Sequence, residues 1–140
     1  MANPIIIDTG VLVALLDKRE QFHKWATEQA QNLNPPFYTC EAVISETCFL
    51  LRSFHKGINA ILSMIEDEIL QIDFSLSNEI SKIKTSMNKY ENVPMSLADS
   101  CLVGMSELID NSVVFTIDSD FLIYRKHGKK VIPLIFPENI

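Results

Sequence analysis

Residues 5–17 read IIIDTGVLVALLD, and this stretch decides the fold. Ile5, Ile6 and Ile7 form a short β-branched run that is apolar on both faces, which is typical of a buried strand in a parallel sheet. The run ends at Asp8, and a second apolar run, which we interpret as the start of a helix, follows Gly10. Burying an unpaired carboxylate is costly, so Asp8 marks either a surface turn or a metal site. The positions of the other carboxylates decide between these readings.

Short apolar strands and amphipathic helices alternate along the rest of the chain. This alternation predicts an α/β fold, with one domain over residues 1–140 and a mainly parallel central sheet flanked by helices. We find no internal repeat and no linker. Strands are expected at 4–8, 37–39, 70–74, 112–118 and 129–135, and helices from residue 10 and at 19–33, 40–54, 58–70, 75–92 and 96–110.

Composition limits the class of protein. The chain has 140 residues, of which 47% are apolar, enough for one domain with a real core. Cys40, Cys48 and Cys101 show no CxxC spacing and are expected to be buried free thiols in a reducing compartment. No apolar run approaches the roughly 18 residues of a membrane helix, and the N-terminus does not resemble a signal peptide. We therefore expect a cytoplasmic protein with no membrane partner.

The charge balance argues at first against nucleic acid as a ligand. Twelve Lys and Arg residues stand against 18 Asp and Glu residues, which gives a formal net charge of -6. Contact with phosphates favours basic surfaces. A nuclease reading therefore requires that cations neutralise some of the carboxylates.

Two aspartates follow strands in the same way. Asp8 ends the first strand, and Asp118 ends the strand SVVFTI, with Asp120 two residues later. Ligand sites of parallel sheets form outside the carboxyl ends of the strands, so neighbouring strands would bring both aspartates to one edge. The alternative is that Asp is simply a common turn residue after a strand.

Glu46 lies in the helical segment AVISETCFLL. Its neighbours one turn away include Val43, Phe49 and Leu50, which places a charge on an apolar face with no Lys or Arg one turn away. Such a charge needs a partner. The alternatives to a place in a functional site are an ion pair between Glu46 and Arg52 or an exposed edge of the helix.

Asp99, in SLADSCLV, has the same kind of surroundings. Ser96 is a candidate N-cap, and Asp99 would then be the third helical residue, where an acid is favoured by the helix dipole. This structural role and a role in a site are compatible.

Four carboxylates brought together would repel one another unless a cation joins them. Hard oxygen ligands suit Mg²⁺ or Mn²⁺ rather than zinc. A cluster of this kind supports metal-assisted phosphoryl chemistry, and it removes the objection from net charge, because the metal would neutralise several negative charges.

IIIDTGVLVALLD, then ISE within a helix, then SLADSCLV, then FTIDSDF resemble the PIN domain family over nearly the whole chain. The pattern is most similar to the small ribonuclease toxins of VapBC-type toxin–antitoxin systems. The resemblance implies an endoribonuclease with a Mg²⁺ or Mn²⁺ site. The residues it implies for that site are the catalytic and metal-binding Asp8, Glu46, Asp99 and Asp118, the additional metal ligand Asp120, and the flanking Thr9 and Thr116.

The same resemblance implies RNA as substrate and a small antitoxin protein as partner. A homodimer is also expected, for which part of the apolar stripe at 58–70 is a candidate surface. Arg125, Lys126, His127, Lys129 and Lys130 form a basic patch that would contact RNA phosphates or be a solvated turn. His23, His55 and His127 have no partner motif for catalysis.

Two other functions compete with a nuclease. A PIN-like fold without catalysis would be a protein-binding module, which the acidic composition favours and the intact acids oppose. A phospho-accepting receiver domain also places Asp at strand ends, but it requires an acidic pair near the first strand, where Asp8 stands alone.

Overall fold

Five short strands form one parallel sheet in the computed structural model, which describes residues 2–138. Their order is β3-β2-β1-β4-β7, so the first strand of the chain lies at the centre. All four pairings are parallel, as the apolar strand sequences predict. The strands are β1 (Ile5–Ile7), β2 (Phe37–Thr39), β3 (Leu70–Ile72), β4 (Val113–Phe115) and β7 (Leu134–Ile135).

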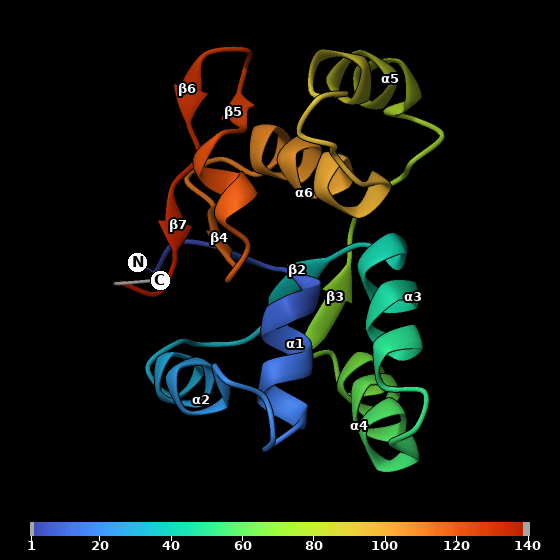
Figure 1. The fold of residues 1–140 in the computed structure, drawn as a ribbon, viewed down its shortest axis with the longest axis vertical. Helices are drawn as coiled ribbons and strands as arrows, with labels where there is room; N and C mark the ends of the chain where they lie inside the picture. Colours follow the sequence, from blue (N-terminus) through green and yellow to red (C-terminus); the bar gives the residue numbers. More distant parts are fainter. Residues whose placement is uncertain (1, 139–140) are drawn as a thin grey trace.

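Six helices flank this sheet within residues 2–138. Figure 1 shows α1 to α4 on one side of the strands, and α5, α6 and a small hairpin on the other. None of the helices in residues 2–138 has the length and apolar character that crossing a membrane requires. The helices are α1 (Thr9–Leu16), α2 (His23–Gln31), α3 (Glu41–Leu50), α4 (His55–Glu66), α5 (Ile80–Lys89) and α6 (Leu97–Leu108), and η1 (Ser119–Leu122) is a single 3₁₀ turn.

The pairing of β1 with β4 places the predicted site. Ile7 lies opposite Phe115, and the N–H of Asp8 donates to the carbonyl oxygen of Phe115 at 3.1 Å. The segments that follow β1 and β4 therefore leave the sheet at the same level. Gly10 allows α1 to start against the segment that follows β4, because a Cβ at this position would lie 2.9 Å from Cγ1 of Ile117. The prediction that Asp8 and Asp118 follow adjacent parallel strands is confirmed.

The predicted final strand at 129–135 is wrong as one element. Lys130–Val131 (β6) pairs antiparallel with Arg125–Lys126 (β5) in a hairpin of its own, whereas β7 joins the main sheet. Pro133 lies between the two pieces and cannot donate a backbone hydrogen bond.

The helices are generally shorter than predicted, and some stripe residues are not buried. Residues 76–79 form turns before α5, and α4 begins and ends earlier than the segment 58–70. Ile61 and Ile83 are buried, whereas Leu62 and Ile80 are 46% and 52% exposed. Periodicity identified the correct helices and overestimated the width of their buried faces.

Candidate metal centre

One carboxylate oxygen from each of Asp8, Asp99 and Asp118 lies within 4.8 Å of the other two. Asp8 follows β1, Asp99 lies in the first turn of α6, and Asp118 follows β4. Asp8 and Asp99 are buried, and Asp118 is half-buried. Segments far apart in the sequence thus bring three of the predicted acids to one point.

Both oxygens of Asp8 accept hydrogen bonds. The backbone N–H of Thr9 donates to Oδ1 at 2.7 Å, and the hydroxyl of Thr116 donates to Oδ2 at 2.8 Å. Thr116 is fully buried and also accepts from the backbone N–H of Asp118 at 3.0 Å. One threonine therefore fixes two of the three aspartates relative to each other.

Asp99 combines the two roles that its sequence allowed. Ser96 is the N-cap of α6, and its hydroxyl accepts from the backbone N–H of Asp99 at 3.0 Å. The Asp99 carboxylate faces the other acids and accepts a hydrogen bond from the Tyr124 hydroxyl at 2.9 Å. Sequence reasoning missed Tyr124, although a phenol in an otherwise apolar segment usually has a polar partner when it is buried.

Asp118 and Asp120 play different parts. The backbone N–H of Asp120 donates to Oδ1 of Asp118 at 2.9 Å, which starts the 3₁₀ turn η1 and orients the Asp118 carboxylate. Among residues 2–138, the group of three converging acids contains Asp118 and not Asp120.

Glu46 does not belong to the close group of Asp8, Asp99 and Asp118. The hydroxyl of Thr9 donates to Oε2 of Glu46 at 3.0 Å, so Thr9 links Glu46 to Asp8. Glu46 is exposed and its neighbour Phe49 is 60% exposed, so the apolar face that carries Glu46 is an exposed edge of the helix, one of the predicted alternatives. Arg52 does not pair with Glu46; its guanidinium donates to the carbonyl oxygen of Phe49 and lies over the Phe49 ring.

Burial and mutual repulsion make these acids hard to ionise. Burial raises the pKa of Asp8 from 3.8 to about 7, against the hydrogen bonds from Thr116 and Thr9 and with a further contribution from the charges of Asp99 and Asp118. Burial also raises the pKa of Asp99, and the hydrogen bond from Tyr124 opposes it. The site therefore favours a cation that would compensate the charges.

No basic side chain of residues 2–138 supplies that cation, since the single ion pair among them joins Arg19 to Asp17. Carboxylate oxygens converging in this way match the ligands that Mg²⁺ and Mn²⁺ prefer. The donor set thus fits a hard divalent ion.

The predicted basic patch lies on the β5–β6 hairpin. Nη1 of Arg125 donates to the carbonyl oxygens of Leu122, Ile123 and Tyr124, so much of its hydrogen-bonding capacity is used within the fold. His23 also has a structural partner, because its Nδ1 lies 2.7 Å from the carbonyl oxygen of Ala14. Neither residue belongs to the group of acids.

Comparisons with known proteins agree with this geometry. The crystal structure of Mycobacterium tuberculosis VapC20, described as a sarcin–ricin loop cleaving toxin, superposes with a TM-score of 0.74 and 18% sequence identity, over 92% of this chain and 99% of that chain. A search of curated proteins gave no match. The family model of the PIN domain matches residues 5–126. This chain therefore belongs to the PIN domain family.

Proposed function

We propose that this protein is an endoribonuclease that depends on Mg²⁺ or Mn²⁺ and hydrolyses phosphodiester bonds of RNA. The observation that carries the proposal is the convergence of Asp8, Asp99 and Asp118 within 4.8 Å. A bound divalent ion would supply Lewis-acid activation of the phosphate and of the attacking water. The PIN family membership and the likeness to an RNA-cleaving toxin favour RNA as the substrate.

The surrounding residues position the ligands of this ion. Thr116 holds Oδ2 of Asp8 and the backbone of Asp118, and Tyr124 holds Oδ2 of Asp99. These contacts fix ligand orientation before the ion arrives, which is how residues behind the ligands tune a metal site. We propose that Glu46, which is exposed and accepts a hydrogen bond from Thr9, accepts a proton or orients water in the reaction.

We also propose that the protein is the toxin of a toxin–antitoxin pair. Phe49 and Leu50 on α3 are 60% and 50% exposed, and Glu46 lies on the same helix. Exposed apolar side chains next to an acidic site suit a partner segment that covers the apolar surface and inserts Arg or Lys among the carboxylates. A homodimer is the expected state of the free chain, which size-exclusion chromatography with light scattering would test.

Cleavage of single-stranded RNA by the purified protein tests the nuclease proposal. We expect cleavage in millimolar Mn²⁺ or Mg²⁺ and none in EDTA, because three adjacent carboxylates without a cation repel a phosphodiester. Cleavage that survives EDTA, or no cleavage with either ion, would favour the protein-binding module.

A further inference from the structure

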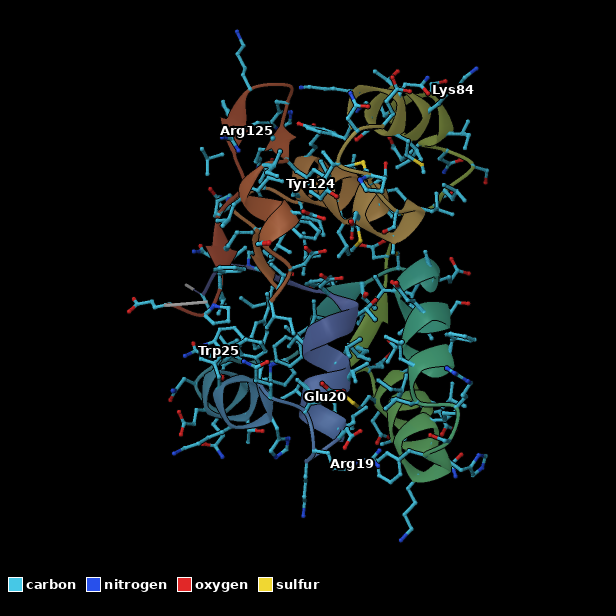
Figure 2. All side chains as sticks on the ribbon, in the orientation of Figure 1. Arg19, Glu20, Trp25, Lys84, Tyr124 and Arg125 are labelled. Atoms are coloured by element: carbon cyan, nitrogen blue, oxygen red, sulfur yellow. The ribbon has the colours of Figure 1, made fainter. Side chains whose placement is uncertain are left out.

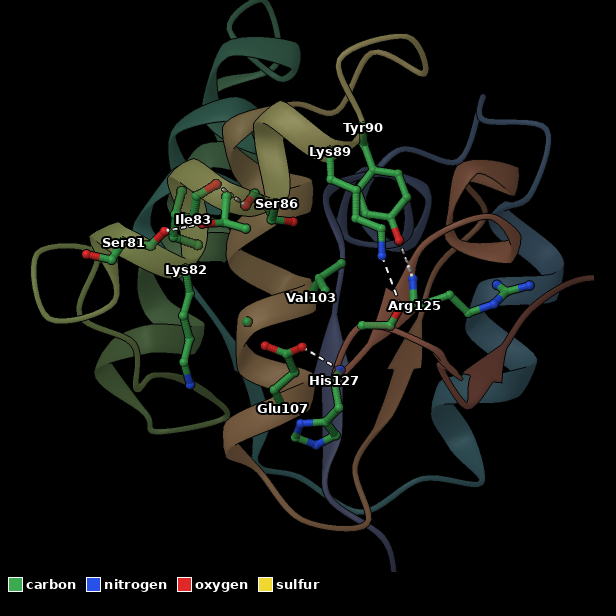
Figure 3. Close-up of a pocket in the computed structure, with 14 residues that line it drawn as sticks. Ser81, Lys82, Ile83, Ser86, Lys89, Tyr90, Val103, Glu107, Arg125 and His127 are labelled. Atoms are coloured by element: carbon green, nitrogen blue, oxygen red, sulfur yellow. Dashed lines mark hydrogen bonds between the residues drawn. The ribbon is translucent and has the colours of Figure 1, made fainter.

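A second concave site lies apart from the three aspartates, between α5, α6 and the β5–β6 hairpin (Figure 3). Its volume is about 420 Å³, within the range of about 300–1,000 Å³ that small-molecule sites occupy. Ser100 lines it and follows Asp99 in α6, but the two side chains point in different directions around the helix.

One wall of this pocket is apolar. Ile83 of α5 and Val103 of α6 are buried, and Gly104 adds no side chain. Tyr90, at the end of α5, closes the wall, and its hydroxyl accepts a hydrogen bond from the backbone N–H of Arg125 at 3.0 Å. Such a wall would bury the apolar part of a ligand.

Cationic side chains also line the pocket: Lys82 and Lys89 from α5 and Arg125 from the hairpin, against the single carboxylate of Glu107. Glu107 already accepts from the backbone N–H of His127, and Lys89 Nζ donates to the carbonyl oxygen of Gly128 at 3.0 Å, which ties α5 to the hairpin. In a protein of net charge -6, this local excess of cations selects an anion.

We propose that this pocket binds a nucleotide, with the base and sugar against Ile83, Val103 and Gly104 and the phosphate at Lys82 and Lys89. The combination of an apolar wall and lysines matches a ligand that is apolar at one end and dianionic at the other. Two sources have this chemistry, a free mononucleotide and one nucleotide of an RNA strand. Only the second source rests on the proposed nuclease function.

The pocket is connected to the aspartates through two aromatic rings. Tyr90 packs edge-on against Tyr124 with 5.1 Å between ring centroids, and Tyr124 donates to Asp99. Only the Tyr90 ring would therefore separate a ligand in the pocket from Tyr124, which contacts Asp99.

Titration of the protein with the four nucleoside 5′-monophosphates in EDTA, followed by calorimetry and amide NMR, tests the proposal. EDTA separates the measurement from cleavage, so the nuclease proposal can fail while the pocket proposal holds. We expect one of these nucleotides to bind and to shift the resonances of Ser86, Val103 and Gly104. The double variant Lys82→Gln/Lys89→Gln should weaken binding about 10-fold or more. Lys84→Gln is the matched control, because Lys84 is exposed on α5 outside the pocket (Figure 2).

Several outcomes would overturn the proposal: no binding at millimolar nucleotide, equal weakening by Lys84→Gln, shifts confined to Asp8 and Asp118, or equal binding of inorganic phosphate or of the nucleoside alone. Should the double variant not fold, Lys82→Gln replaces it, since Lys82 makes no hydrogen bond or ion pair within residues 2–138. A short single-stranded RNA added to Asp99→Asn identifies the source. Displacement of the mononucleotide supports binding of an RNA nucleotide, and retention supports binding of a free nucleotide.

Discussion

Tyr124 donates a hydrogen bond to Oδ2 of Asp99 across 2.9 Å, and both residues are buried. The Tyr124 ring also packs edge-on against Tyr90 and Phe121. This hydrogen bond favours the ionised form of Asp99, whose pKa is otherwise raised by burial. Tyr124 thus supports a ligand of the proposed ion without being one of the acids.

Tyr124→Phe removes the hydroxyl and keeps the ring packing. We expect the Mn²⁺ concentration that gives half-maximal cleavage to rise about 10-fold, as is usual when a partner of a metal ligand is lost. The increase should be smaller at higher pH, where Asp99 ionises without help. Tyr38→Phe on β2 serves as the control. An unchanged Mn²⁺ requirement in Tyr124→Phe would show that this hydrogen bond does not support the ion.

Ser96→Ala separates the capping role from the site. Its hydroxyl accepts from the backbone N–H of Asp99, and loss of an N-cap costs about 1 kcal/mol of stability. We expect a lower free energy of unfolding in urea, with the cleavage rate per folded molecule unchanged. A large loss of rate at full stability would mean that Ser96 acts in the site itself.

The pH dependence of stability tests the burial of Asp8. The pKa of Asp8 is about 7 in the folded protein against 3.8 for a solvated aspartate, so between these values the folded state holds a proton that the unfolded state has released. In EDTA this group therefore destabilises the fold as pH rises from about 4 to about 7, by up to a few kcal/mol. Asp8→Asn removes the effect.

The measurement is urea unfolding of the wild type and of Asp8→Asn in EDTA at pH 5 and pH 8. We expect the stability advantage of Asp8→Asn over the wild type to grow with pH. Mn²⁺ should stabilise only the wild type, or stabilise it more strongly than it stabilises Asp8→Asn. An advantage that shrinks with pH would contradict the raised pKa.

The sequence predicted most of the fold and part of the site, for local reasons. Short-range patterns predicted the order of the strands and helices of the main sheet and the N-cap at Ser96. They also predicted that the strands followed by Asp8 and Asp118 are neighbours, and the structure has all of these features. The exposure of Glu46 depends on whether another element covers α3, which helical neighbours alone do not indicate. Tyr124 and the hairpin escaped prediction, because their contacts with Asp99 and across β5–β6 are set by tertiary packing.

The exposed side chains of α3 lead to a prediction about the partner. Phe49→Ser and Leu50→Ser should each abolish co-purification with a co-expressed small basic protein from the neighbouring gene, while the rate of RNA cleavage stays unchanged. Leu108→Ser is the control, since Leu108 is also 50% exposed but lies at the end of α6. Retention of the partner by both α3 variants would place its binding surface elsewhere.

The most direct test compares Asp99→Asn with Asp73→Asn in cleavage of single-stranded RNA with Mn²⁺. Asp73 follows the edge strand β3 as Asp8 follows β1, but it is exposed and outside the group of three aspartates. We expect Asp99→Asn to lower the rate per folded molecule by about 100-fold or more, and Asp73→Asn to leave it unchanged. Equal rates for Asp99→Asn and the wild type would contradict the central claim that the three aspartates hold a catalytic ion.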